Sequence, residues 1–202
     1  MNIRKLLVKK LLDWSVSLSG TIYHKSGITT DGSFRTYTGV KFNLIRPDES
    51  MINIDDIARG LSLKPHFSGH TPFFFSIANH SLMVESMVSK AYPDDYEVRL
   101  AALLHDGTES YLGDMIKPLK NLLPNFEVIE DNVERVIFSK YAIDPSLLKI
   151  VKHYDIISQD YESRVFREGV DVDGILEVYS MEEAERIFLE RFYFLISKYK
   201  NR

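Results

Sequence analysis

The chain has 202 residues, of which 45% are hydrophobic, and its 25 Lys and Arg stand against 29 Asp and Glu. This length suits a single domain with a full hydrophobic core. The formal net charge of −4 argues against a protein that coats nucleic acid through a broadly basic surface. Because there is no cysteine, disulfides, zinc–thiolate sites, iron–sulfur clusters and cysteine nucleophiles are excluded. Metal chemistry would therefore depend on carboxylates and on the six histidines.

The amino-terminal segment is predicted to form a helix that docks on the domain. Its apolar side chains fall at helical spacing, at Ile3, Leu6, Leu7, Leu11 and Trp14. Lys9 and Lys10 interrupt the apolar run, unlike in a secretory signal, and a membrane-surface helix is the alternative. No segment approaches the roughly 20 apolar residues that span a bilayer. We therefore expect a cytoplasmic protein without membrane association.

Residues 20–47 differ from the rest of the chain. They are rich in Gly and Thr and contain two short β-prone runs, Thr21–Tyr23 and Phe34–Thr38. This composition predicts a loop region with a small hairpin.

From about Asn53 onward the pattern is helical. Asn53 or Asp55 can cap a first helix that runs to Leu63. The apolar spacing predicts further helices over residues 76–92 and 97–106.

Three more helices are expected in the second half. One follows Pro124, and the next opens at Pro145 and carries a buried side through Leu148, Val151 and Ile157. The last runs over residues 181–200, with Glu early and Lys late, as the helix dipole favours. We therefore predict an all-α fold with a small irregular or β element near the N-terminus. Residues 1–202 form a single domain, in which 1–35 are an N-terminal extension and 181–200 the C-terminal helix.

Four ionisable side chains fall on apolar faces of these helices. His80 follows Ile77 by three residues, Asp155 follows Val151 by four, and His105 and Asp106 end an apolar run. Taken singly, each has an ordinary explanation: a core histidine with a hydrogen-bond partner, or an aspartate that caps a helix or pairs with an arginine. Taken together, two imidazoles and two carboxylates on buried faces match a divalent metal site, since an unpaired buried charge is costly.

This donor set suits Mn, Fe, Co, Ni or Zn, and suits Mg less well. Four protein ligands on an octahedral ion leave room for a water and a substrate oxygen, the arrangement of metal-assisted hydrolysis. Glu109 lies four residues beyond His105, so a continuing helix would place it one turn from the metal as a proton acceptor or donor. A solvated residue at a helix end is the alternative for Glu109.

Four stretches of the sequence resemble the HD-domain metal-dependent phosphohydrolases. They are FNLIRPDESMINIDDIARGLS, HFSGHTPFFFSIANHS, AALLHDGTESYLGDMIKPLK and VKHYD. The likeness is greatest to the 5′-deoxynucleotidase (YfbR-like) branch, which includes the phage dATP triphosphohydrolases (DatZ-like). It covers residues 36–165 and implies a helical HD-domain bundle.

The resemblance assigns roles to individual residues. It implies that His80 is the first metal ligand, that His105 and Asp106 are the HD pair, and that Asp155 is the last ligand. Glu109 matches the catalytic glutamate of the H-D-x-x-E pattern.

Further roles concern the substrate. Asp114 matches an aspartate at the nucleotide's sugar, and we group it with Glu109 as catalytic. Lys120 and Lys152 match lysines that reach the phosphates, and Phe67 offers an aromatic wall for the sugar or base. A surface lysine or a core aromatic is the ordinary alternative for these three positions.

The sequence departs from the family at two positions. His66 stands where the family usually has an arginine that binds phosphate. A guanidinium that donates two parallel hydrogen bonds is thus replaced by an imidazole that donates one. Arg46, Arg59 or Lys64 could compensate for that loss. Asn79 stands where many members have a glutamate before the first ligand.

The resemblance implies a metal-dependent phosphohydrolase that acts on deoxynucleotides, either as a 5′-nucleotidase on monophosphates or as a triphosphohydrolase. The alternatives are an HD hydrolase of another phosphoester, such as a cyclic nucleotide or ppGpp, and a non-catalytic protein that binds metal or nucleotide. We expect a small-molecule nucleotide substrate, no stable binding of nucleic acid, and a homo-oligomer.

Overall fold

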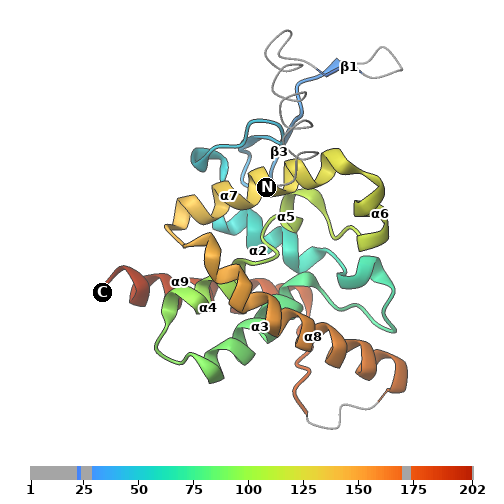
Figure 1. The fold of residues 1–202 in the computed structure, drawn as a ribbon, viewed down its shortest axis with the longest axis vertical. Helices are drawn as coiled ribbons and strands as arrows, with labels where there is room; N and C mark the ends of the chain where they lie inside the picture. The colour runs from blue at the N-terminus through green and yellow to red at the C-terminus, as the bar shows by residue number, and fades with distance from the viewer. Residues whose placement is uncertain (1–21, 24–28, 170–173, 202) are drawn as a thin grey trace.

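The computed structural model describes residues 22–23, 29–169 and 174–201. The predicted N-terminal helix lies outside the described residues. The rest of the chain is built mainly of helices, which confirms the all-α prediction (Figure 1). Among the described helices, none is both long and apolar enough to cross a membrane.

The predicted β element is present near the N-terminus. β1 (Ile22–Tyr23) pairs antiparallel with β2 (Thr29–Thr30), and β3 (Ser33–Arg35) pairs antiparallel with β4 (Lys41–Asn43). Phe42 anchors the second pair because its fully buried ring stacks on Tyr111 at a centroid distance of 4.1 Å.

The first two helices of the domain begin close to their predicted starts, the first of them at the predicted cap Asn53. A short 3-10 turn, η1 (Glu49–Met51), precedes α2 (Ile54–Leu63), whose N-cap Asn53 accepts a hydrogen bond from the backbone of Asp55. The turn η2 (His66–Gly69) leads to α3 (Ile77–Ala91), which Ser76 caps through the backbone of Asn79.

The next segment differs from the prediction. α4 (Tyr96–Leu104) ends two residues before the predicted end, and residues 105–108 form a turn held by short-range bonds such as Gly107 N–H to Leu104 C=O. Two short helices follow that the pattern did not predict, α5 (Glu109–Leu112) and α6 (Lys117–Leu122). Each is too short to show helical periodicity in the sequence.

The three late helices match the predictions, apart from one residue. They are α7 (Pro124–Tyr141), α8 (Leu148–Glu168), which follows the turn η3 (Pro145–Leu147), and α9 (Met181–Lys200). Ile157 was expected on the buried side of α8 but is 43% exposed. The buried side runs through Val151, Asp155 and Ser158 at spacings of three and four, and Ile157 falls off that line.

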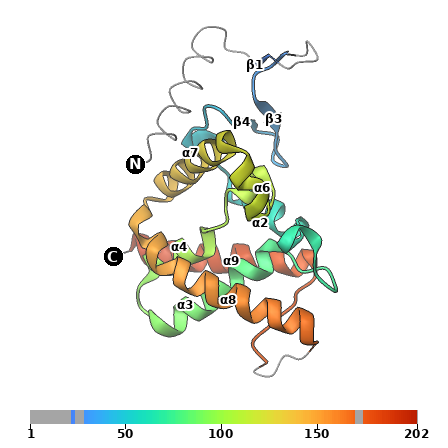
Figure 2. The same ribbon diagram turned by 45° about the vertical axis from the view of Figure 1, so that its right-hand side comes forward.

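The hydrophobic core lies where α9 packs against α2 and α4 (Figure 2). Phe188 and Phe192 of α9 are buried there. α3 packs against both α4 and α8, so it connects this core to α8. Therefore the buried faces of α3 and α8 meet beside the end of α4.

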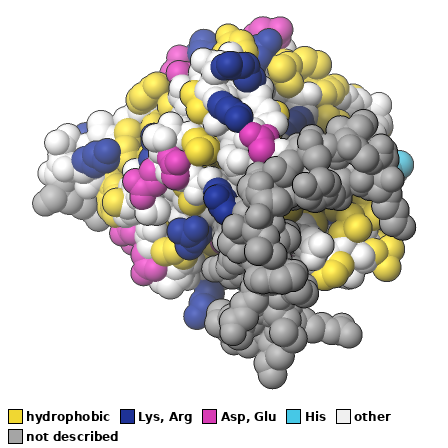
Figure 3. Space-filling model, turned by 90° about the horizontal axis from the view of Figure 1, so that it is seen from above, with side chains coloured by type: hydrophobic (Ala, Val, Ile, Leu, Met, Phe, Trp, Pro, Cys, Tyr) yellow, Lys and Arg dark blue, Asp and Glu magenta, His cyan; other side chains and the backbone are white. Residues whose placement is uncertain are grey.

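The surface carries charges of both signs. Figure 3 shows Lys, Arg, Asp and Glu side chains interspersed with hydrophobic ones on one face of the molecule. On this face the described residues form no broad basic surface.

Candidate metal centre

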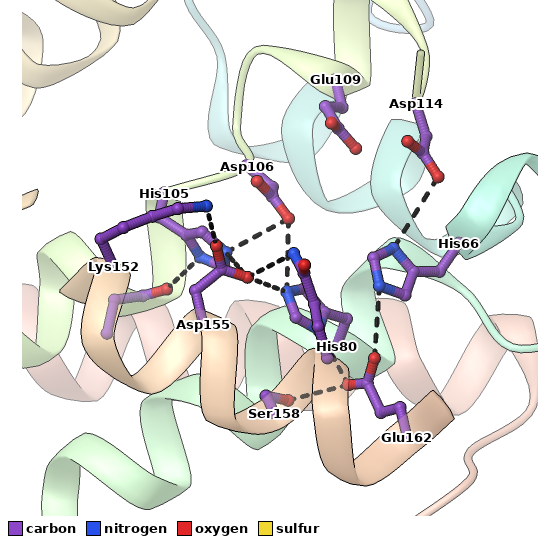
Figure 4. Close-up of polar contacts among 12 residues, drawn as sticks. His66, His80, His105, Asp106, Glu109, Asp114, Lys152, Asp155, Ser158 and Glu162 are labelled. Carbon is purple, nitrogen blue, oxygen red and sulfur yellow. Dashed lines mark hydrogen bonds and ion pairs between the residues drawn. The ribbon is translucent and has the colours of Figure 1, made fainter. Parts of the chain in front are cut away.

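The four predicted metal ligands come together from three parts of the fold (Figure 4). His80 lies on α3 and Asp155 on α8, while His105 and Asp106 lie in the turn after α4, and not on a helix as predicted. His80 Nε2 lies 3.1 Å from Asp155 Oδ1 and 3.6 Å from Asp106 Oδ2. His105 Nε2 lies 3.2 Å from Asp106 Oδ2 and 3.8 Å from Asp155 Oδ1. Two imidazole nitrogens and two carboxylate oxygens therefore share one small space.

The Nδ1 atoms of His80 and His105 contact groups outside this shared space. His105 Nδ1 lies 2.8 Å from the Ala102 carbonyl, which can only accept, so Nδ1 carries the proton. His80 Nδ1 lies 2.8 Å from Glu162 Oε1. Both Nε2 atoms consequently face the shared space, the orientation that metal-binding histidines need.

The electrostatics of the cluster favour positive charge at its centre. Burial by itself lowers the pKa of His105, but the nearby carboxylates of Asp106 and Asp155 raise it to about 10. Burial likewise opposes the charge on His80, yet the carboxylates of Glu162, Asp155 and Asp106 raise its pKa well above the usual value. The histidines in turn lower the pKa values of Asp106 and Asp155 against the effect of burial.

These residues fit a divalent ion. Metal–ligand bonds of about 2.1 Å place neighbouring ligand atoms about 3 Å apart, close to the separations here, and His80, His105 and Asp155 form a compact group of candidate ligand atoms. His105 Nε2 is a buried atom without a hydrogen-bond partner. An ion would satisfy that atom and offset the two carboxylates. The fold thus contains a buried group of His and Asp side chains that could hold a metal ion.

A second compact group consists of His66, His80 and Glu162. The rings of His66 and His80 are stacked, with centroids 4.3 Å apart and planes only 16° apart. An imidazole binds a metal near its own plane, and two stacked, nearly parallel rings share no such position. The first group is therefore the better candidate for a metal ion.

Glu162 was not predicted as a site residue. It is fully buried on α8, and although burial raises its pKa, the contacts with His80 and His66 together lower it to about 2. The sequence contained a signal, because Glu162 lies seven residues beyond Asp155 and so on the same helix face.

A cavity of about 500 Å³ adjoins the predicted metal ligands. Asp106 and Asp155 reach it from the cluster, and Glu109, Asp114 and Phe67 also line it. In Figure 4, Glu109 and Asp114 lie on one side of the cluster, beyond Asp106, and Glu162 lies on the opposite side, beyond His80. The structure therefore brings the predicted catalytic residues to the same cavity as two of the predicted ligands, Asp106 and Asp155.

Glu109 reaches this cavity from the first residue of α5. Its side chain is 10% exposed, and its Oε2 atom has no hydrogen-bond partner. Burial and the charges of Asp106 and Asp114 raise the pKa of Glu109 well above its usual value. A lysine lies close by, since Lys120 Nζ is 3.8 Å from Glu109 Oε1. Such a carboxyl group is suited to exchange a proton.

The loop that carries His66 and Phe67 has an unusual backbone. Phe67 and Ser68 both have φ near 52°, in the left-handed region that disfavours residues other than Gly, Asn and Asp. Asp114 holds the loop, since its Oδ2 accepts a bond of 2.8 Å from Ser68 N–H. His66 Nδ1 lies 3.8 Å from the same oxygen, and Nε2 lies 3.2 Å from Glu162 Oε2, without hydrogen-bond geometry in either contact.

Three lysines line the cavity: Lys117, Lys120 and Lys152. Lys152 Nζ lies 2.5 Å from Asp155 Oδ2, and Lys120 Nζ lies 2.7 Å from Glu130 Oε1. Lys117 was not predicted, since nothing marks it in the sequence apart from its charge.

Arg46, Arg59 and Lys64, which could have replaced the family arginine, lie outside the cavity. Arg59 pairs with Glu185, and Lys64 donates to the backbone carbonyls of Glu109 and Ser110. Neither these two nor Arg46 is among the residues that line the cavity. Asn79 exchanges hydrogen bonds with the backbone of Tyr179, so it secures the segment before α9.

The fold and the site together define a helical protein with a buried group of His and Asp side chains able to hold a metal ion. No family model matches the chain. Over 130 residues it is 35% identical to the uncharacterized protein YfdR of Escherichia coli (strain K12), covering 64% of this chain and 70% of that protein. Over 158 residues it is 32% identical to the uncharacterized protein RCAP_rcc00048 of Rhodobacter capsulatus, covering 76% of this chain and 78% of that protein. The chain belongs to the same family as these two proteins.

Proposed function

We propose that this protein is a metal-dependent phosphohydrolase of the HD-domain type that acts on deoxynucleotides. The observation that carries the proposal is the cavity in which a buried, unpartnered Glu109 oxygen accompanies Asp106, Asp155 and three lysines. A proton-exchanging group, a candidate metal centre and cations for phosphate are the parts that phosphoester hydrolysis requires.

His80, His105, Asp106 and Asp155 would hold the ion. When bound, a divalent ion supplies positive charge that lowers the pKa of water and polarises a phosphate oxygen. The cavity is lined by more carboxylates than lysines, so an anionic substrate gains most from added positive charge. We therefore expect binding of the substrate to depend on the metal.

The protein's own residues divide the remaining work. Glu109 accepts a proton from the attacking water and returns it to the leaving oxygen. Lys152 and Lys120 offset the negative charge of the phosphate. Asp114 and Phe67 bound the sugar side of the cavity, held in place by the bond between Asp114 and Ser68.

Two substitutions separate metal binding from turnover. We expect Asp106→Ala to lose both the metal and the activity, because it removes a ligand. Glu109→Gln should retain the metal and lose about 10²- to 10⁴-fold in kcat, the usual contribution of a general acid or base. Metal content by elemental analysis and phosphate release would measure the two effects. Glu190→Gln, at an exposed position on α9, is the matched control.

The substrate class is tested with a panel of deoxynucleoside monophosphates, deoxynucleoside triphosphates, cAMP and ppGpp. Hydrolysis of the deoxynucleotides, to nucleoside plus phosphate or to nucleoside plus triphosphate, supports the proposal. Hydrolysis of only cAMP or ppGpp would replace it with the alternative HD activities. Turnover by Glu109→Gln at the wild-type rate would contradict the mechanism.

A further inference from the structure

We infer that Glu162 is a positioning residue for the metal centre: it holds His80 in the one tautomer and orientation that present Nε2 to the ion. The inference rests on the proposed function. It assigns to Glu162 no contact with substrate or metal, only control of His80.

Glu162 is a buried carboxylate, and its charge must be compensated by partners. Its side chain has no exposed surface, and an isolated buried carboxylate is costly. Its Oε1 atom lies 2.8 Å from His80 Nδ1 and accepts a bond of 2.8 Å from the Ser158 hydroxyl. Its Oε2 atom faces His66 Nε2 at 3.2 Å. This carboxylate thus contacts His80 of the cluster, Ser158 one turn earlier on α8, and His66 in the turn η2.

The bond to Nδ1 determines what the other nitrogen can do. A carboxylate accepts hydrogen bonds, so Nδ1 carries a proton. A proton on Nε2, which Asp155 Oδ1 can accept at 3.1 Å, is the one that a metal ion would displace, leaving the Nε2 lone pair for the ion. In the opposite tautomer, Nε2–H would direct a proton at the metal position. Glu162 therefore favours the metal-binding form of His80, as a carboxylate behind a metal-bound histidine does in other proteins.

Ser158 and Glu162 lie one turn apart on α8, and Asp155 lies on the same face. The Ser158 bond fixes the Glu162 side chain against the ring of His80. α8 consequently supplies one predicted ligand directly and orients another that belongs to α3 (Figure 4).

A second buried glutamate provides the contrast. Glu85, five residues beyond His80 on α3, is equally buried, but its oxygens receive bonds from Arg99 and Arg191. Glu85 thus joins α3 to α4 and α9 and touches none of the predicted ligands. Replacing either glutamate with glutamine removes one buried charge, and only Glu162 should affect the metal.

The test is the affinity of the full chain for Co²⁺, measured by competition with a chelator and by the visible absorption of the bound ion. Glu162→Gln keeps an oxygen that can accept from Nδ1 but loses the charge, and Glu162→Met removes the acceptor at similar volume. We expect the Gln variant to bind about 10-fold more weakly and the Met variant about 100-fold more weakly. The Co²⁺ spectrum of both variants should change, since His80 is reoriented.

Glu85→Gln is expected to lose stability to denaturant while it keeps the wild-type Co²⁺ affinity and spectrum. Wild-type affinity in both Glu162 variants, or an equal loss in Glu85→Gln, would overturn the inference and leave the proposed function standing. Absence of Co²⁺ binding in the wild-type protein would overturn the proposed function itself, and the inference with it. If Glu162→Met does not fold, Glu162→Gln decides the outcome.

Discussion

At the scale of single residues, Glu109 lies in surroundings that disfavour its charged form. Burial and the carboxylates of Asp106 and Asp114 raise its pKa, while Lys120 lowers it only in part. A raised pKa makes the Glu109 carboxylate a stronger proton acceptor, which suits a group that takes a proton and then returns it. Its place at the start of a four-residue helix positions it beside the cavity.

This environment predicts a pH dependence of stability. The folded state holds the Glu109 proton more tightly than the unfolded state, whose pKa is near 4.5. The contribution of this group to stability is therefore fully present below that value, and it is lost as the pH rises through the raised pKa. We expect the free energy of unfolding of the metal-free wild type to fall, relative to Glu109→Gln, as the pH rises above about 4.5.

Denaturant unfolding of the two proteins at a series of pH values measures this difference. Glu190→Gln serves again as the control, because the Glu190 side chain is 63% exposed. A difference between wild type and Glu109→Gln that does not change with pH would show that burial does not shift the ionisation of Glu109.

At the scale of elements, α5 depends on its close approach to α2. A Cβ atom added at Gly60 would lie 2.8 Å from both the Cβ and the carbonyl oxygen of Ser110. Lys64, just after α2, holds α5 from the same side through the carbonyls of Glu109 and Ser110. α2 thus sets the position of the helix that carries Glu109.

Gly60→Ala should therefore push α5 away from α2. We expect the free energy of unfolding to fall by roughly 1–3 kcal/mol, the usual cost of overpacking, and the turnover to fall with it because Glu109 moves. Lys149→Ala, an exposed substitution on α8, should change stability by less than about 0.5 kcal/mol. Denaturant unfolding measures both variants, and an unchanged stability in Gly60→Ala would refute the close approach.

At the scale of the whole molecule, the site joins segments that are far apart in the sequence. His80 and Asp155 are separated by 75 positions, and they meet because α3 packs on α8. A metal ion bound between them would link these segments in the folded state only. Binding to the native state alone raises stability by mass action.

Divalent ions are accordingly expected to raise the melting temperature. At a free ion concentration about 100 times the Kd, the gain in unfolding free energy should be about 2.7 kcal/mol. Thermal unfolding with Mn²⁺, Co²⁺ or Zn²⁺, against the same protein in chelator, measures the shift. Asp106→Ala should lose the shift and Glu85→Gln should keep it. An equal shift in Asp106→Ala would place the ion elsewhere.

Much of the fold could be predicted because its causes are local. Asn53 and Ser76 cap the helices that follow them, and α9 begins and ends at the predicted residues. The short helices α5 and α6 escaped prediction, since four and six residues carry too little periodicity. The end of α4 was also misplaced, because the turn at residues 105–108 depends on short-range backbone bonds that side-chain pattern does not reveal.

The candidate site divides in a similar way. His80 and Asp155 could be found because an ionisable residue on an apolar helix face stands out in the sequence. Glu162 lies on that same face of α8 and was overlooked, since a single glutamate in a charged helix attracts no notice. Nothing in the sequence signalled the position of Lys117 at the cavity or the backbone geometry at Phe67. Both depend on how distant segments pack together.

The sequence by itself determined the longer helices, the cap at Asn53, and a ligand set limited to His and carboxylate by the absence of cysteine. Only the tertiary structure decided that residues of α3, α8 and the turn after α4 face one space. It also decided that Glu162 contacts the Nδ1 atom of His80. The physical reason is the range of the interactions. Caps and apolar periodicity act within a few residues of the chain, whereas a metal centre is formed by contacts between helices whose packing the local pattern does not encode.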